Sequence, residues 1–181
     1  MQLTVDSDAA FLVLPKAHSR IAGYFRLLDK PSLTRHLHNG AILIECKTIR
    51  HVVTSAAEAE THAVYHNARI AIPLRHLLVQ MGHPQLPTSI TTDNSTAAGY
   101  VNGNIQTKKS KSWDMRLHWL RDEHNKQFFN VNWAKGDSNK ADYFTKHHST
   151  IHHRKHRPQY VYDSFRVMVN KLNSMCKTSQ Y

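Results

Sequence analysis

The chain has 181 residues, which is enough for one domain plus an extra segment. It contains 24 Lys or Arg against 13 Asp or Glu, a formal net charge of +11, and this excess predicts a polyanionic partner, above all nucleic acid. Its longest clean apolar run, residues 9–14, ends at Pro15 and is too short to cross a bilayer. Two cysteines and a start without signal-like character predict an intracellular protein, cytoplasmic or nuclear, that is not secreted.

Three extended segments are predicted at the N-terminus. Residues 3–8 alternate apolar and polar side chains, which predicts a strand with Asp6 and Asp8 on one face near its C-terminal end. Apolar runs at residues 20–28 and 41–46 flank Asn39-Gly40, a strong hairpin signal. We therefore expect a meander of three antiparallel strands.

A long helix is predicted from Ser55 to about Met81. Ser55 and Glu58 have the spacing of a capping box, and Pro73 is expected to kink or divide the helix. Glu60 falls on the apolar face, so its carboxylate either points at the sheet and needs a cation or occupies a solvated helix end. The apolar face is predicted to contain Ala63, Val64, Ile70, Ala71, Leu74, Leu77, Leu78 and Met81.

Residues 88–98 are predicted to form a strand followed by a helix. Ile90 and the neighbouring threonines favour an extended backbone, and Asn94 or Ser95 can cap the helix. Asp93 then lies at the C-terminal end of the strand, where ligands and metals gather in α/β proteins. The alternative is a plain turn or cap residue.

A basic loop precedes the next helix. Its lysines, Lys108, Lys109 and Lys111 (the basic-loop lysines), have no acid among them, which suits contacts with phosphates or a solvated charge run. In the helix that follows, at residues 112–121, we expect Trp119 and Leu120 to lie in the core.

The last strand is predicted at residues 128–133, with a helix beginning within residues 139–146. Asp137 or Ser138 is the natural cap, which leaves Asp142 about one turn inside the helix. Histidines alternate with Arg and Lys from His147 onward, so we divide the chain into a domain at residues 1–146 and a basic extension at 147–181, with a helix near 160–175. Zinc binding there lacks cysteine partners and the spacing of known zinc modules, so a basic arm or a mobile tail is favoured.

Four carboxylates, Asp8, Glu60, Asp93 and Asp142, occupy positions that α/β topology can bring together. Crowded carboxylates raise one another's pKa unless a cation neutralises them. Hard oxygen ligands select Mg²⁺ or Mn²⁺, and two such ions can bind a phosphodiester from both sides. Metal-dependent cleavage of a nucleic acid is therefore our hypothesis.

Four motifs surround these acids: SDAAFL at residues 7–12, SAAEAE at 55–60, TDNS at 92–95 and NKADYFTK at 139–146. In this order they resemble the ribonuclease H domain at the end of copia-type retrotransposon polyproteins, over roughly residues 3–156. The resemblance implies a mixed α/β, ribonuclease H-like fold: a five-stranded mixed sheet, three antiparallel strands first, with flanking helices. It also implies that the RNA strand of an RNA–DNA hybrid is cleaved, leaving 3′-hydroxyl and 5′-phosphate ends.

By the family pattern, Asp8 would bridge two Mg²⁺ ions, for which Mn²⁺ can substitute. Asp142 would complete the ligand set of the first ion, and Glu60 and Asp93 would complete that of the second. Asp6 is the rival for the first position, although SDAAFL fits the family better with Asp8 as the ligand. Cellular relatives carry a His in the loop before the last carboxylate, thought to assist product release; residues 135–138 lack it, so turnover is more in question than cleavage.

Hybrid recognition is expected through the backbone and the 2′-hydroxyls, with the basic-loop lysines and Arg116 as candidate phosphate contacts. The expected partners are the hybrid and a reverse transcriptase domain upstream of this one. Met1 lies only seven residues before Asp8, so we expect that reverse transcriptase to be absent from this chain. No membrane or small-molecule cofactor is expected. An integrase-type polynucleotidyl transferase would place its Glu last, whereas Glu60 is second of four. An inactive nucleic-acid-binding remnant of the element is the remaining alternative.

Overall fold

The structure is a computed structural model that describes residues 1–28, 40–103 and 111–161, without the side chains of residues 111–114. The chain divides into two compact units. The first contains residues 1–35 and 41–147, and the second contains residues 36–40 and 148–181. Within the described residues, no helix is both long enough and apolar enough to span a membrane.

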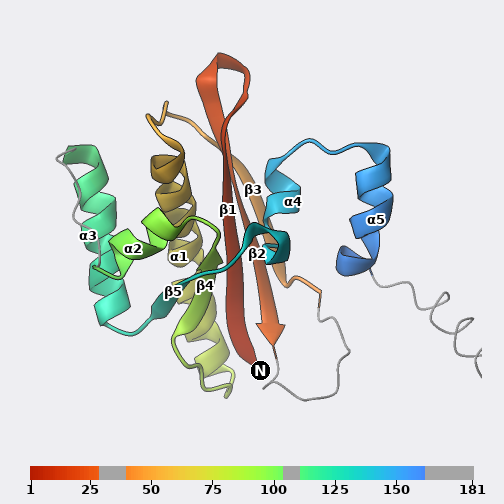
Figure 1. Ribbon diagram of the computed structural model, residues 1–181. Helices are drawn as coiled ribbons and strands as arrows, with labels where there is room; N and C mark the ends of the chain where they lie inside the picture. Colours follow the sequence, from red (N-terminus) through yellow and green to blue (C-terminus); the bar gives the residue numbers. More distant parts are fainter. Residues whose placement is uncertain (29–39, 104–110, 162–181) are drawn as a thin grey trace, which may run out of the picture. The chain divides into compact units, whose positions relative to one another are not determined.

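A five-stranded mixed sheet forms the centre of the first unit, in the order β3-β2-β1-β4-β5 (Figure 1). β1 (Gln2–Leu14) pairs antiparallel with β2 (His18–Leu28), which pairs antiparallel with β3 (Leu43–Ile49). β4 (Thr88–Thr92) runs parallel to β1, and β5 (Phe129–Trp133) runs parallel to β4. This topology confirms the predicted mixed α/β class with three antiparallel strands first.

β1 is longer than predicted. Its pairing with β2 continues past Asp8 to Ala10 and resumes at Leu14 after an irregularity, and a short 3-10 turn, η1 (Pro15–Ala17), connects the two strands. The apolar run at residues 9–14 has no alternation, so its pattern does not distinguish a strand from a buried helix. The predicted turn at Asn39 lies outside the described residues.

α1 (Ala56–Gln80) begins at the predicted cap, where the Ser55 hydroxyl accepts a bond from the Glu58 amide at 3.1 Å. The Glu58 carboxylate accepts from the Thr54 amide at 2.7 Å instead of returning to Ser55, so the capping box is incomplete. The helix runs unbroken through Pro73, and the prediction of a division is wrong. Pro73 is exposed, so the carbonyl deprived of its amide partner by the proline can be hydrated.

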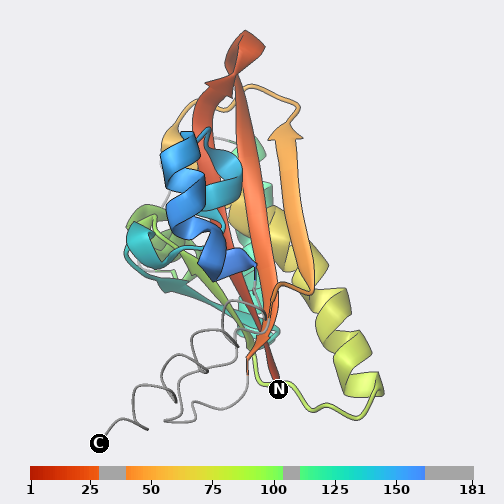
Figure 2. The ribbon, with the colours of Figure 1, turned by 90° about the vertical axis from the view of Figure 1, so that its right-hand side faces the viewer.

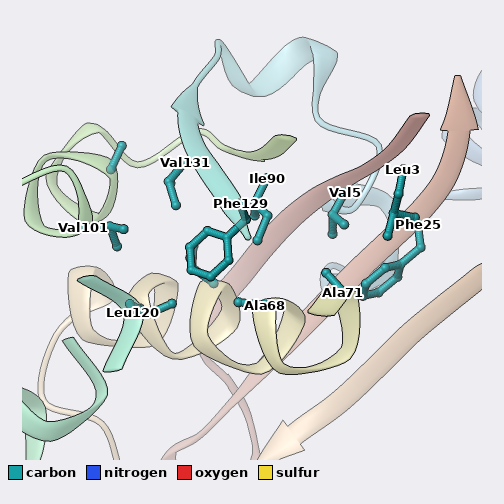
Figure 3. Packing of buried hydrophobic residues seen from close by; sticks show 12 residues of the cluster. Leu3, Val5, Phe25, Ala68, Ala71, Ile90, Val101, Leu120, Phe129 and Val131 are labelled. Carbon is teal, nitrogen blue, oxygen red and sulfur yellow. The ribbon is translucent and has the colours of Figure 1, made fainter. Parts of the chain in front are cut away.

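The main core lies between one face of the sheet and three helices: α1, α2 (Ser95–Val101) and α3 (Lys111–Asn125). Figure 3 shows Phe25 and Phe129 of the sheet close to Ala68 and Ala71 of α1, whose small side chains allow the helix to approach. Leu120 of α3 is fully buried, as predicted.

Two residues depart from the predicted apolar face of α1. Leu77 and Met81 are 51% and 62% exposed, because the last turns of the helix extend beyond the buried cluster. Trp119 is half-buried and packs edge-on against Tyr65 with ring centroids 5.2 Å apart, in agreement with a core position.

The opposite face of the sheet receives α4 (Asp142–Thr145) (Figure 2). Strand side chains alternate, so Asp6 and Asp8 point to this face while Val5 and Ser7 point toward α1. A helix begins within residues 139–146 as predicted, but it is a single turn that starts at Asp142 after a 3-10 turn, η2 (Gly136–Ser138), so the prediction that Asp142 lies one turn inside the helix is wrong.

The cap predicted at Asp137 or Ser138 is also wrong. Ala141 precedes α4 and makes no side-chain capping bond, while the Asn139 side chain accepts a bond from the Ala141 amide at 3.0 Å. This local bond competes with helix formation before Asp142.

The second unit contains α5 (Thr150–Tyr160), capped by Ser149. It begins well before the predicted helix at 160–175, most of which lies outside the described residues.

Candidate active site

Three of the four predicted carboxylates converge. Asp8 of β1, Glu60 of α1 and Asp93 directly after β4 each place a carboxylate oxygen within 4.8 Å of the others. Among the described residues, they form the only cluster of three or more acidic, His or Cys side chains that could hold a metal ion. The three acids lie far apart in sequence, so the fold itself assembles the group.

The sheet explains where the group lies. β4 pairs with β1 only as far as Asp6 opposite Thr91, while β1 continues past this point alongside β2. Asp8 and Asp93 therefore lie beyond the last β1–β4 pair, where the two strands separate. The Trp133 indole donates to the Asp93 carbonyl at 2.8 Å and fixes the backbone at the end of β4.

Glu60 is 6% exposed and faces the sheet, which excludes the alternative that its carboxylate occupies a solvated helix end. Its carboxylate accepts bonds from the Ala9 amide at 3.2 Å and from the Thr92 hydroxyl at 3.4 Å. Both donors are neutral. Burial, reinforced by the charges of Asp8 and Asp93, raises the pKa of Glu60 to about 9.

Asp8 is 2% exposed and accepts a hydrogen bond from the Thr145 hydroxyl of α4. Burial raises its pKa to about 6, the Thr145 bond opposes this rise, and the charges of Asp142 and Asp93 add to it. Two neighbouring carboxyls thus both resist ionisation, because each is buried and each faces further negative charge.

Asp142 lies outside the three-carboxylate group. Its side chain pairs with Lys146, four residues later, although its charge still raises the pKa of Asp8. The Asn139 amide anchors this segment by donating to the Ser7 carbonyl at 2.9 Å, immediately before Asp8. Asp142 is therefore held beside the group but engaged by a protein cation.

Asp6, the rival of Asp8, has a different environment. Its carboxylate lies 3.3 Å from the Arg26 guanidinium, so a protein cation already pairs with it. Asp6 is not part of the three-carboxylate group.

The loop between β5 and α4 lies against Asp93. A Cβ added at Gly136 would stand 3.0 Å from an Asp93 carboxylate oxygen, so the glycine permits this close approach. This loop therefore lies beside the three-carboxylate group.

The predicted phosphate contacts are only partly described. Lys108 and Lys109 lie outside the described residues, as does the side chain of Lys111. Arg116 of α3 lies 3.3 Å from His51 and 6.0 Å from the centre of the Tyr65 ring. Its guanidinium thus lies over the Tyr65 ring of α1 and beside His51, which precedes that helix.

The three-carboxylate group suits a hard divalent cation. All its side-chain donors are carboxylate oxygens, the donor type preferred by Mg²⁺ and Mn²⁺. A divalent cation would also favour the ionised forms of Asp8 and Glu60, which burial and mutual repulsion disfavour.

Sequence reasoning overlooked four neighbours of the acids: Thr92, Asn139, Thr145 and Lys146. The signal was present for two of them, because Thr145 and Lys146 follow Asp142 by three and four residues, the spacing that places side chains side by side on a helical turn. Thr92 and Asn139 act through contacts between distant segments, which no local pattern encodes.

Ribonuclease H domains are among the solved structures similar to this chain. The N-terminal RNase H domain of a Mycobacterium tuberculosis protein, solved as a fusion with maltose-binding protein, has a TM-score of 0.54 and 13% identity, covering 80% of this chain and 90% of that one. LC11-RNase H1 in complex with RNA/DNA hybrid has a TM-score of 0.55 and 11% identity, covering 78% and 92%.

A second structure of LC11-RNase H1, isolated from compost by a metagenomic approach, has a TM-score of 0.56 and 12% identity, covering 79% and 91%. No protein-family model matches the chain, and no match to a curated protein was found. At these identities the likeness defines the fold, which is ribonuclease H-like.

Proposed function

We propose that the protein is a metal-dependent endonuclease that cleaves the RNA strand of RNA–DNA hybrids. The convergence of Asp8, Glu60 and Asp93 beyond the last β1–β4 pair of a ribonuclease H-like sheet carries this proposal. The basic composition supports a polyanionic substrate. The hybrid present in the LC11-RNase H1 structure supports the choice of substrate.

In this proposal, Asp8, Glu60 and Asp93 bind divalent metal, Mg²⁺ or Mn²⁺, and Asp142 completes the set by exchanging Lys146 for the ion. Two bound ions would supply activation of the attacking water and stabilisation of the leaving oxygen. Ala9 and Thr92 orient the Glu60 carboxylate, and Thr145 orients Asp8, through the bonds described above. Arg26 keeps Asp6 out of the ligand set.

Substrate contacts are assigned to the basic-loop lysines and Arg116, which would bind phosphates along the hybrid. The sequence motifs support an origin in a copia-type retrotransposon polyprotein, in which a reverse transcriptase precedes this domain. Such a protein would act inside the cell, in the cytoplasm or nucleus, where hybrids are made.

The decisive experiment incubates the purified chain with a labelled RNA–DNA hybrid, duplex DNA and duplex RNA, with Mg²⁺, with Mn²⁺ and with chelator. We expect cleavage of the RNA in the hybrid alone, and only with metal. Binding of the hybrid without cleavage would support the inactive remnant instead. Strand transfer into duplex DNA would support the integrase-type alternative.

Asp8→Asn and Asp93→Asn each test the site. Both variants should lose cleavage by at least about 100-fold, since a metal ligand contributes several kcal/mol to transition-state stabilisation, and both should still bind the hybrid. Asp137→Asn is the matched control, because Asp137 is an exposed acid on the neighbouring loop. Full metal-dependent activity in both test variants would refute the site assignment.

A further inference from the structure

A row of histidines on α5 is separate from the carboxylate group. His148, His152 and His156 are spaced four residues apart, and each is half-buried. The rings of His148 and His152 are stacked with centroids 4.1 Å apart and planes 5° apart, and the rings of His152 and His156 have the same spacing at 20°. The row lies within the second unit alone.

We propose that this row binds a borderline divalent transition metal, such as Zn²⁺, through a pair of imidazoles that always includes His152. The sequence pattern alone does not reveal this site because cysteines and a zinc-module spacing are missing. The helix supplies what the pattern lacks: side chains four residues apart project from one face and lie as neighbours. Imidazole nitrogen is a preferred donor for Zn²⁺, Ni²⁺ and Cu²⁺.

The ring spacing suits chelation. Two nitrogens on one tetrahedral Zn²⁺ are roughly 3.3 Å apart, from bonds of about 2 Å. Rings with centroids at 4.1 Å reach this spacing by small rotations about their side-chain bonds. Three rings in a row give two overlapping pairs, His148 with His152 and His152 with His156, so one ion at a time is bound.

The electrostatics of α5 act in both directions. Partial desolvation and the neighbouring imidazoles, His148 and His156 first, lower the pKa of His152, which favours the neutral form that binds metals. Arg154, Lys155 and Arg157 on the same helix oppose a cation, but their exposed charges are screened over about 8 Å at physiological salt.

The test is calorimetric titration of the full chain with Zn²⁺ in excess Mg²⁺, which occupies hard oxygen sites. We expect one equivalent of Zn²⁺ to bind the wild type. His152→Ala removes both pairs and should weaken binding at least about tenfold, the minimum expected for loss of one of two chelating ligands. His148→Ala and His156→Ala each leave one pair and should weaken binding only about twofold.

His153→Ala is the matched control. His153 is an exposed imidazole on the same helix, and its ring stands nearly perpendicular to that of His148 with centroids 5.8 Å apart, so it is not stacked as the rings of the row are. We expect unchanged binding. Asp8→Asn should also bind Zn²⁺ normally, which separates this site from the carboxylates.

Amide hydrogen exchange gives a second measurement on the same proteins. Zn²⁺ should slow exchange of residues 150–160 in the wild type and in His153→Ala, but not in His152→Ala, because the ion links adjacent turns. The proposal is refuted if wild type binds no Zn²⁺ under excess Mg²⁺, or if His152→Ala binds as well as His153→Ala.

Discussion

Glu60→Gln tests whether the carboxylate group is strained without metal. The folded protein holds a proton on Glu60 up to about pH 9, whereas the unfolded chain releases it near the ordinary value of 4.5. Between these two pH values the folded state binds more protons, so its stability falls as pH rises. At pH 7.5 the difference corresponds to at most about 4 kcal/mol, three pH units at about 1.4 kcal/mol each.

Glutamine is neutral at every pH and can still accept the Ala9 amide bond. Part of the gain is lost because one carboxylate oxygen becomes an amide group beside Thr92. We therefore expect metal-free Glu60→Gln to be about 1 to 3 kcal/mol more stable than wild type near pH 8, which raises the melting temperature by about 3 to 10 °C. Near pH 4.5 the gain should vanish.

Thermal unfolding followed by circular dichroism, at several pH values with chelator and with Mg²⁺, measures these effects. Mg²⁺ should raise the melting temperature of wild type and raise that of Glu60→Gln much less, while cleavage is lost in the variant. Glu58→Gln is the control: its amide oxygen can still accept the Thr54 bond, but the negative charge in the first turn of α1 is lost, so the variant should be slightly destabilised. The reasoning fails if metal-free Glu60→Gln is less stable than wild type near pH 8, or if its gain does not depend on pH.

Three further predictions concern other parts of the structure. Gly23→Ala places a Cβ 2.2 Å from the Asn67 side-chain oxygen in a fully buried site, so urea unfolding should show a loss of about 1 to 3 kcal/mol; no loss would refute the packing described there. Asn139→Ala releases the segment before Asp142 from Ser7, so kcat should fall at least about tenfold while unfolding free energy falls by about 1 to 3 kcal/mol; full rescue of kcat by Asn139→Asp would argue against the donated amide bond. Replacing all basic-loop lysines with Gln should make the slope of log binding constant against log salt concentration shallower, by the equivalent of about two to three phosphate contacts. An unchanged slope would show that these lysines do not contact phosphates of the hybrid.

Much of the three-carboxylate group is predictable from local signals. The cap at Ser55 sets the phase of α1, which turns Glu60 inward, and the change from strand to helix at Asn94 places Asp93 at a strand end. Both inferences need only residues close in sequence. The strand order adds the one non-local fact, that β1 and β4 are neighbours.

The surroundings of Asp142 resist such prediction. A helix of one turn has no periodicity to detect, and its position depends on Asn139 bonding to Ser7 and Thr145 bonding to Asp8. Such contacts join opposite ends of the first unit and leave no trace in a short sequence window. For the same reason, the exposed end of α1 at Met81 could not be separated from its buried part by periodicity alone.

The assembly of the site from distant segments has a consequence for refolding. Asp8 contacts Thr145 across 137 residues of chain, and Glu60 contacts Ala9 across 51. Contacts of such long range form slowly compared with a helix or hairpin. During renaturation, therefore, helical circular dichroism should recover before the proposed cleavage activity, and the activity regained at any moment should be proportional to the fraction of molecules that have reached the complete native topology.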